Sequence, residues 1–267
     1  MGNILDELAD YARLRVAEAR KKKPLEEIRN EAESLGPGEK PFRFEKALSE
    51  GGEIHFICEC KKASPSKGLI APEFPYLDIA RQYEAAGASA ISVLTEPKWF
   101  LGSLDYLREI AGTVKTPCLR KDFTVDPYMI YEAKLAGASA VLLIAAILDT
   151  DTIAQYLEIA DSVGLSAIVE AHDEAEVASA AAAGARIIGV NNRNLKDFTV
   201  DIHNSIRLRK LAPSETVFVA ESGIRTPEDV ETLRQNGVNA VLIGEQLMRA
   251  ESPEAELERL RGDIAGR

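Results

Sequence analysis

The sequence predicts an α/β protein with a (β/α)8 (TIM) barrel and extra N-terminal helices, and two observations carry this prediction. First, a segment that ends a helix at a glycine and enters a buried strand occurs four times, around Gly87, Gly137, Gly184 and Gly237, at steps of 50, 47 and 53 residues. Second, helix and strand patterns alternate about every 25 residues, as parallel strands require. Eight such units fit a barrel in 267 residues. An open doubly wound sheet is the alternative, but no Gly-x-Gly-x-x-Gly motif follows the first strand.

The composition fits one domain over residues 1–267, with residues 1–50 as a helical extension packed on the barrel. The net charge of −11 argues against nucleic acid and anionic membranes as partners, although a local basic pocket can still bind a small anion. Three cysteines outside any metal-ligand array indicate a reducing compartment. Because we find neither a signal peptide nor an apolar run long enough to span a membrane, we expect a cytoplasmic protein, and we take it to be a monomer.

Residues 3–50 have helical patterns. The first helix has Asn3 as a candidate N-cap and an apolar stripe made of Ile4, Leu5, Leu8, Tyr11, Leu14 and Val16. Lys21–Pro24 interrupts this helix, and two further helices follow at Leu25–Leu35 and Phe44–Leu48. Because the stripe must be buried, we expect the first helix to pack over the rim of the barrel where (β/α)8 proteins form their active sites, and to shield that rim from water.

The eight strands comprise Ile54–Cys58, the four strands of the repeat, and three short strands between its copies, at 117–120, 166–169 and 217–220. The helices between them are expected at Leu77–Ala86, Ser103–Ile110, Pro127–Ala136, Thr150–Val163, Glu174–Ala183, Ile202–Leu211 and Pro227–Asn236.

The end of the first strand has an acid and an amine in alternation. Glu59 and Lys61 share one face, and Cys58 and Cys60 share the other, where they pack against helices. A buried acid and amine are costly unless they are paired or used, so the two readings are an internal ion pair and a reactive site.

Other strand ends add polar side chains, and in a barrel the active site forms at these ends. They include Lys121, Glu170, Asn191 and the Glu221-Ser222 segment. Any one glutamate alone could be a structural partner, but so many polar ends together predict a polar site. Arg120 and Asp122 alternate away from Lys121 and are interpreted as structural, and His172 as a loop residue. No cluster has zinc-ligand spacing, so no metal is expected.

The loops after the seventh and eighth strands have small residues just before the next helix begins, at Ser222-Gly223 and Gly244-Glu245. In barrels these two loops commonly bind phosphate through backbone N–H groups. We therefore expect a phosphate between them.

Taken together, these motifs resemble indole-3-glycerol-phosphate synthase over nearly the whole chain. They are Glu59-x-Lys61 with Lys62–Gly68, Leu94-Thr95-Glu96 with Phe100-x-Gly102-Ser103, Leu119–Phe123, Val169-Glu170-x-His172, Gly189-x-Asn191-Asn192-Arg193, and Glu221–Ile224. The resemblance implies a cofactor-free lyase of tryptophan biosynthesis. Its substrate would be 1-(2-carboxyphenylamino)-1-deoxyribulose 5-phosphate, which closes to an indole with loss of carbon dioxide and water.

The resemblance also implies roles for individual residues. The catalytic set is Glu59, Lys61, Lys121, Glu170, Asn191 and Ser222. Phosphate would be bound at Gly223, Gly244 and the backbone of Glu245, the aromatic ring would lie between Phe100 and Phe123, and Ser64 and Arg193 would contact substrate. Glu245 departs from the family, where many relatives have a small residue, so its carboxylate should point away from the phosphate.

The chemistry of the residues agrees with this resemblance. Attack of carbon on a ketone requires a proton donor for the oxygen, which suits Lys121, and the later steps need carboxylate bases, which suit Glu170 and Glu59. Lys61 can steer the substrate carboxylate, and the division of the dehydration step between the two Lys–Glu pairs stays open. The rival readings are another phosphate-binding barrel enzyme, such as an isomerase, and a non-catalytic barrel.

Overall fold

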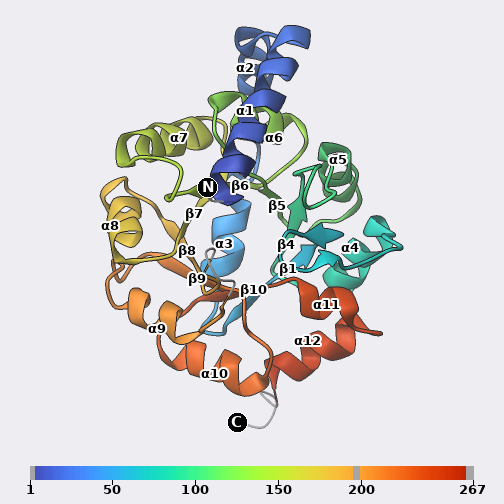
Figure 1. Ribbon diagram of the computed structural model, residues 1–267, viewed down its shortest axis with the longest axis vertical. Helices are drawn as coiled ribbons and strands as arrows, with labels where there is room; N and C mark the ends of the chain where they lie inside the picture. Colours follow the sequence, from blue (N-terminus) through green and yellow to red (C-terminus); the bar gives the residue numbers. More distant parts are fainter. Residues whose placement is uncertain (1–3, 195–198, 263–267) are drawn as a thin grey trace.

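The computed structural model describes residues 4–194 and 199–262, and its centre is a closed barrel of parallel strands (Figure 1). Each strand pairs with the next along the chain, and the last pairs with the first. The barrel strands are β1 (His55–Cys60), β4 (Ala90–Leu94), β5 (Cys118–Lys121), β6 (Ala140–Ile144), β7 (Ser166–Ala171), β8 (Ile187–Asn191), β9 (Val217–Glu221) and β10 (Ala240–Ile243). The predicted (β/α)8 barrel is confirmed, whereas the predicted Asn3 cap lies outside the described residues.

Helices surround the barrel because each strand is followed by a segment with an apolar face (Figure 1). Several begin at side-chain N-caps, such as Ser103, Asp126 and Thr226. The helices of this ring are α4 (Tyr76–Ala85), α5 (Leu104–Thr113), α6 (Pro127–Leu135), α7 (Thr150–Ser162), α8 (Glu174–Ala182), α9 (His203–Arg209), α10 (Pro227–Gln235), α11 (Glu245–Arg249) and α12 (Pro253–Arg261). The last two were not among the predicted helical segments.

Alternation along the strands divides the core into two clusters. Side chains such as Ile57, Leu119 and Val219 fill the barrel interior, and their neighbours Cys58, Cys118 and Phe218 pack outward against the helices. The predicted outward packing of Cys58 and Cys60 is confirmed, since both belong to the outer cluster. Glu59, between them, points inward.

The three N-terminal helices serve different ends of the barrel. Helix α3 (Arg43–Ser49) closes the end where the strands begin: Phe44 and Leu48 join the interior cluster, and Ser166 Oγ at the start of β7 accepts the backbone N–H of Glu45 at 3.2 Å. Helix α2 (Leu25–Ser34) packs on α6. Helix α1 (Ile4–Lys22) lies across the opposite end (Figure 1).

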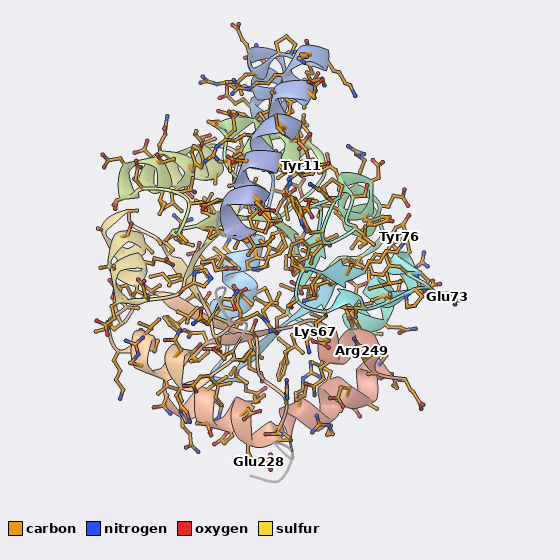
Figure 2. All side chains as sticks on the ribbon, viewed as in Figure 1. Tyr11, Lys67, Glu73, Tyr76, Glu228 and Arg249 are labelled. Carbon is orange, nitrogen blue, oxygen red and sulfur yellow. The ribbon has the colours of Figure 1, made fainter. Side chains whose placement is uncertain are left out.

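Helix α1 is fixed to the barrel mouth by polar and aromatic contacts. Its Arg15 binds Asp122 and its Arg20 binds Asp126. The ring of Tyr11, a residue of α1 labelled in Figure 2, meets the ring of Trp99 edge-on, with 5.5 Å between centroids. The predicted position of this helix over the rim is therefore the one observed. The predicted stripe was wrong at Leu14, whose exposure of 65% shows that it lies on the solvent side of the helix.

The segment that contains Ser64–Gly68, after β1, forms a small hairpin. Strand β2 (Ala63–Ser64) pairs antiparallel with β3 (Gly68–Leu69), so the residues between them project over the mouth of the barrel. None of the helices in the described part of the chain combines the length and apolar character needed to cross a membrane.

Candidate active site

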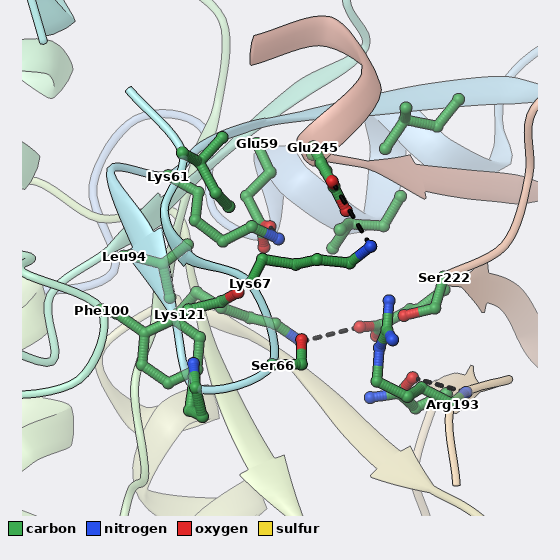
Figure 3. A pocket seen from close by; sticks show the side chains of 18 of the residues that line it. Glu59, Lys61, Ser66, Lys67, Leu94, Phe100, Lys121, Arg193, Ser222 and Glu245 are labelled. Carbon is green, nitrogen blue, oxygen red and sulfur yellow. Dashed lines mark hydrogen bonds and ion pairs between the residues drawn. The ribbon is translucent and has the colours of Figure 1, made fainter. Parts of the chain in front are cut away.

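A cavity of about 420 Å³ lies at the C-terminal ends of the barrel strands (Figure 3). All thirteen residues assigned to the site from the sequence line it: Glu59, Lys61, Ser64, Phe100, Lys121, Phe123, Glu170, Asn191, Arg193, Ser222, Gly223, Gly244 and Glu245. Ile4, Leu5 and Leu8 of α1 line it too, so helix α1, which lies over the mouth of the barrel as a lid, forms part of its wall. Residues more than 180 positions apart in the chain thus share one cavity.

Glu59 and Lys61 form the first pair in the cavity. Strand β1 ends at Cys60, and the Lys61 ammonium just beyond it binds Oε1 of Glu59 (Figure 3). Ser92 Oγ lies 3.4 Å from the other carboxylate oxygen. On the opposite face, burial raises the pKa of the Cys58 thiol to about 12, so Cys58 stays protonated and is no nucleophile.

Lys121, the last residue of β5, lies between two buried carboxylates. Its Nζ is 2.7 Å from Oε2 of Glu170 and 2.7 Å from Oε2 of Glu221. Burial alone would lower the pKa of this lysine, but the charges of Glu170 and Glu221 outweigh burial and raise it. From the sequence alone no net shift in this pKa is predicted, because burial of Lys121 and the nearby charges of Glu59 and Glu170 act in opposite directions.

The pKa values of the two carboxylates that share Lys121 are shifted in opposite directions. Burial would raise the pKa of Glu170, but the positive charges of Lys121 and His172 prevail and lower it. Burial raises the pKa of Glu221, and the nearby charge of Glu170 raises it further against the opposing effect of Lys121. Two like charges around one ammonium cannot both be ionised cheaply, so Glu170 stays anionic and Glu221 takes up a proton more readily.

Glu221 was recognised from the sequence as a polar strand end but was given no role in the site, although the alternation of β9 indicates one. Val219 points into the barrel, so Glu221, two residues on, points into the cavity at the strand end. The neighbouring Ser222 has a left-handed backbone with φ of 69°, and its carbonyl accepts Asn192 Nδ2 at 3.1 Å. This turn changes the direction of the chain directly after Glu221.

Asn191 and His172 complete the surroundings of Glu170. Asn191 Nδ2 lies 3.4 Å from Oε1 of Glu170, and its Oδ1 accepts the backbone N–H of Arg193 at 3.0 Å. His172, interpreted from the sequence as a loop residue, has its Nε2 at 3.4 Å from the same oxygen of Glu170. It therefore belongs to the shell around the site.

The apolar side of the cavity includes two phenyl rings. The centroids of Phe100 and Phe123 are 6.1 Å apart, and Leu142 and Ile144 of β6 extend the same wall. The loop that presents Phe100 is fixed by Glu96, whose buried carboxylate accepts the backbone N–H groups of residues 98, 99 and 100 at 2.7–2.9 Å. This apolar wall, with its two phenyl rings, suits contact with a flat aromatic group.

The predicted phosphate loops also meet at the cavity. Gly223 and Gly244 line it, and a Cβ on Gly244 would lie 2.8 Å from Lys61 Nζ and would collide with the carboxylate of Glu59. Only glycine leaves this space open. The carboxylate of Glu245 is neutralised by two cations, Arg249 Nε at 3.2 Å and Lys67 Nζ at 3.7 Å (Figure 3).

In the part of the chain that the structure describes, no group of three or more His, Cys, Asp or Glu side chains is placed to hold a metal ion. The groups available for chemistry are ammonium ions paired with carboxylates, beside two phenyl rings and two glycine-containing loops. A barrel with such a cavity is a (β/α)8 enzyme of the acid–base type.

Comparison with known proteins identifies the family. A model of the family "Indole-3-glycerol phosphate synthase" matches residues 5–260. A protein of that name from Ruminiclostridium cellulolyticum is 60% identical over 97% of this chain and 99% of its own, and one from Endomicrobium trichonymphae is 51% identical with the same coverage. The chain belongs to the indole-3-glycerol phosphate synthase family, a family of carboxy-lyases.

Solved structures show the same fold at much lower identity. A mutant tryptophan synthase alpha-subunit from Pyrococcus furiosus is 14% identical with a TM-score of 0.58, over 79% of this chain and 98% of that one. Another mutant of the same subunit gives a TM-score of 0.59 at 15% identity, over 78% and 98%. These likenesses support the barrel alone.

Proposed function

We propose that this enzyme converts 1-(2-carboxyphenylamino)-1-deoxyribulose 5-phosphate to indole-3-glycerol phosphate, with release of carbon dioxide and water. The observation that carries the proposal is the juxtaposition of two ammonium–carboxylate groups in one cavity. Lys121 with Glu170 and Glu221 forms one, and Lys61 with Glu59 forms the other.

The substrate is oriented by its two ends. Its phosphate binds between the Ser222-Gly223 and Gly244-Glu245 loops, where backbone N–H groups and the absence of a Cβ at Gly244 favour a close approach. Its aromatic ring lies against the apolar wall of the cavity, beside Phe100 and Phe123. A phosphate found at the other end of the barrel in a liganded structure would refute this orientation.

Ring closure begins when the aromatic carbon attacks the ketone carbon. Lys121 donates a proton to the ketone oxygen as the new carbon–carbon bond forms; its raised pKa means that it holds this proton at neutral pH. Lys61 steers the substrate carboxylate, which leaves as carbon dioxide and returns its electron pair to the ring.

Dehydration then makes the indole. The hydroxyl formed from the ketone leaves as water after protonation by a lysine, and a carboxylate accepts the proton of the ring nitrogen. Glu170, which remains anionic beside Lys121, and Glu59, beside Lys61, are the two available bases. Asn191 positions Glu170, and Ser64, Arg193 and Ser222 contact the substrate.

We further propose that the chain is a single domain that acts as a monomer in the cytoplasm, without nucleic acid or membrane as a partner. Packing of the N-terminal helices on the barrel supports the single domain, and the net charge of −11 supports the absence of polyanionic partners.

The test is direct conversion of the substrate by purified protein, followed by the fluorescence of the indole product. The proposal predicts product formation in step with release of carbon dioxide, without an added cofactor. A well-folded protein that binds the substrate and forms no indole would refute it. If the protein instead returned an isomer that keeps its carboxyl group, it would be the isomerase alternative.

A further inference from the structure

His172 lies between two carboxylates at the edge of the active site. Its Nε2 is 3.4 Å from Oε1 of Glu170, and its Nδ1 is 3.0 Å from Oε2 of Glu176. The side chain is 17% exposed, and its Nε2 is fully buried without a hydrogen bond of good geometry. The ring therefore joins the site to the first turn of α8.

Glu176 is itself rigidly placed, so it can orient the ring. Its Oε2 also accepts the backbone N–H of His172 at 2.7 Å, and its own backbone N–H is bound by the N-cap residue Asp173 at 3.0 Å. Asn204 of α9 donates to the carbonyl of His172 at 3.2 Å. Backbone and ring are thus both held, with Nε2 at 3.4 Å from Oε1 of Glu170.

This arrangement favours the charged form of the ring. A neutral imidazole has one N–H, so one of its two nitrogens would direct a lone pair at a carboxylate, whereas an imidazolium donates to both. The charged groups facing it are Glu170 on β7, Glu176 on α8 and Glu221 on β9, with Lys121 beyond Glu170. Burial lowers the pKa of His172, but the carboxylates of Glu176 and Glu170 prevail and raise it.

We propose that His172 is a positioning residue whose imidazolium holds Glu170 by the oxygen that Lys121 does not bind. Lys121 takes Oε2 of Glu170, and His172 with Asn191 faces Oε1. The carboxylate is thereby fixed in its orientation and kept ionised for the step in which it accepts a proton. This inference rests on the proposed role of Glu170 as a base.

The charge of the ring is measured first, by nitrogen NMR of the histidine side chains. The chain has three histidines, so the signals of His172 are assigned by their loss in His172→Gln. The inference predicts that both ring nitrogens of His172 are protonated at neutral pH, and that Glu176→Gln lowers the pKa at which the ring loses its charge. A ring that is neutral at pH 7 in the wild type would overturn it.

Kinetics then test positioning against a merely structural role. In His172→Gln, kcat should fall about tenfold, because Glu170 loses the neighbouring positive charge that keeps it ionised and oriented, while KM changes little. The wild-type kcat should also fall as pH rises through the pKa of His172, because a lone pair then faces Glu170, and this alkaline step should be missing in the variant. His203→Gln, on the exposed start of α9, is the matched control and should behave as wild type.

An unchanged kcat with an unchanged pH profile in His172→Gln would overturn the inference. If that variant fails to fold, Glu176→Gln must still reduce kcat and move the alkaline step to lower pH, and its failure to do so is equally decisive. The proposed function fails separately, through the absence of indole product with the wild-type protein.

Discussion

The guanidinium of Arg15 on helix α1 binds both carboxylate oxygens of Asp122, at 2.6 Å and 3.1 Å. Asp122 directly follows Lys121 at the end of β5, so the lid helix is tied to the strand that presents the proposed acid. Asp122 is also bound by Thr95 Oγ1 at 2.6 Å and by Arg120, and its side chain is completely buried. Closure of the cavity and placement of Lys121 are therefore linked through one carboxylate.

Removal of Arg15 should loosen the lid while the barrel stays intact. In Arg15→Ala, Asp122 keeps Arg120 and Thr95, but α1 loses a bidentate anchor, so KM should rise about tenfold with a smaller change in kcat. Arg13→Ala is the matched control, because Arg13 pairs on the same helix with Asp10 at the surface. Steady-state kinetics on both variants decide, and equal KM values would show that Arg15 does not hold the lid.

Asp122 should give the protein a pH-dependent stability. Burial alone would raise the pKa of its carboxyl, but Arg120 and Arg15 prevail and lower it to about 2 from 3.8. Because the folded pKa is depressed, this stabilisation is fully present above the ordinary value and is lost as pH falls from 3.8 through 2. Its size is about 2 kcal/mol in the free energy of unfolding.

The measurement is urea unfolding of the wild type and of Asp122→Asn between about pH 5 and about pH 2. The wild type should lose about 2 kcal/mol more than the variant over this range. The variant should also be less stable than the wild type at neutral pH, because two buried arginine contacts lose their counter-charge. Parallel pH curves for the two proteins would show that Asp122 does not titrate as proposed.

The barrel could be predicted from the sequence, but this network could not. The glycine repeat and the alternation of Glu59 with Cys58 and Cys60 are local patterns, and local patterns report strand phase. The ion pair between Arg15 and Asp122 joins residues 107 positions apart in the chain. It therefore depends on where helix α1 packs on the folded barrel. The alternation along the strand places Asp122 on the face opposite Lys121, and this predicted a structural role for Asp122. It could not indicate that Arg15 is the residue that binds Asp122.

Glu221 should matter for turnover more than for stability. In Glu221→Gln, Lys121 keeps Glu170 but loses its second carboxylate at 2.7 Å, so kcat/KM should fall at least about tenfold. The folded pKa of Glu221 is raised, so ionising it weakens the fold as pH rises above its ordinary value of 4.5. As pH rises from acid to alkaline values, the free energy of unfolding of Glu221→Gln should therefore increase relative to that of the wild type.

Unfolding curves and kinetics on Glu221→Gln are compared with those of Glu228→Gln, at the solvent-exposed start of α10 (Figure 2). The control should match the wild type in both measurements. Loss of stability at alkaline pH in Glu221→Gln, with turnover retained, would assign Glu221 a structural role instead.

Gly244 should tolerate no side chain. In Gly244→Ala the new methyl group would press on Lys61 Nζ and the Glu59 carboxylate, so the pair would shift and the phosphate loop would move with it. KM should rise at least about tenfold, because a misplaced loop weakens ground-state binding. Gly112→Ala on α5 is the control: nothing lies within 4 Å of its Cβ, so activity should be unchanged and stability should rise by up to about 1 kcal/mol. Equal KM values for the two variants would contradict the close approach at Gly244.

Most site residues could be placed from the sequence because they end strands, and strand phase decides which side chains face the cavity. Glu221 was recognised as part of a polar strand end, but the site role was assigned to the neighbouring Ser222, which begins a left-handed turn. The pKa direction of Lys121 could not be predicted, since it depends on a second carboxylate 100 positions away. The direction of such a pKa shift follows only from the distances between charged groups in the folded protein.

Lys121 is proposed to donate the proton during ring closure, and single-turnover kinetics of Lys121→Met test this role. Loss of a general acid should slow the bond-forming step at least about a hundredfold while substrate still binds. Lys134→Met, which removes a lysine that binds the Val163 carbonyl on α7, controls for general effects of losing an ammonium group. The melting temperature of each variant shows whether it is folded. A folded Lys121→Met that closes the ring at a near-normal rate would remove Lys121 from the mechanism.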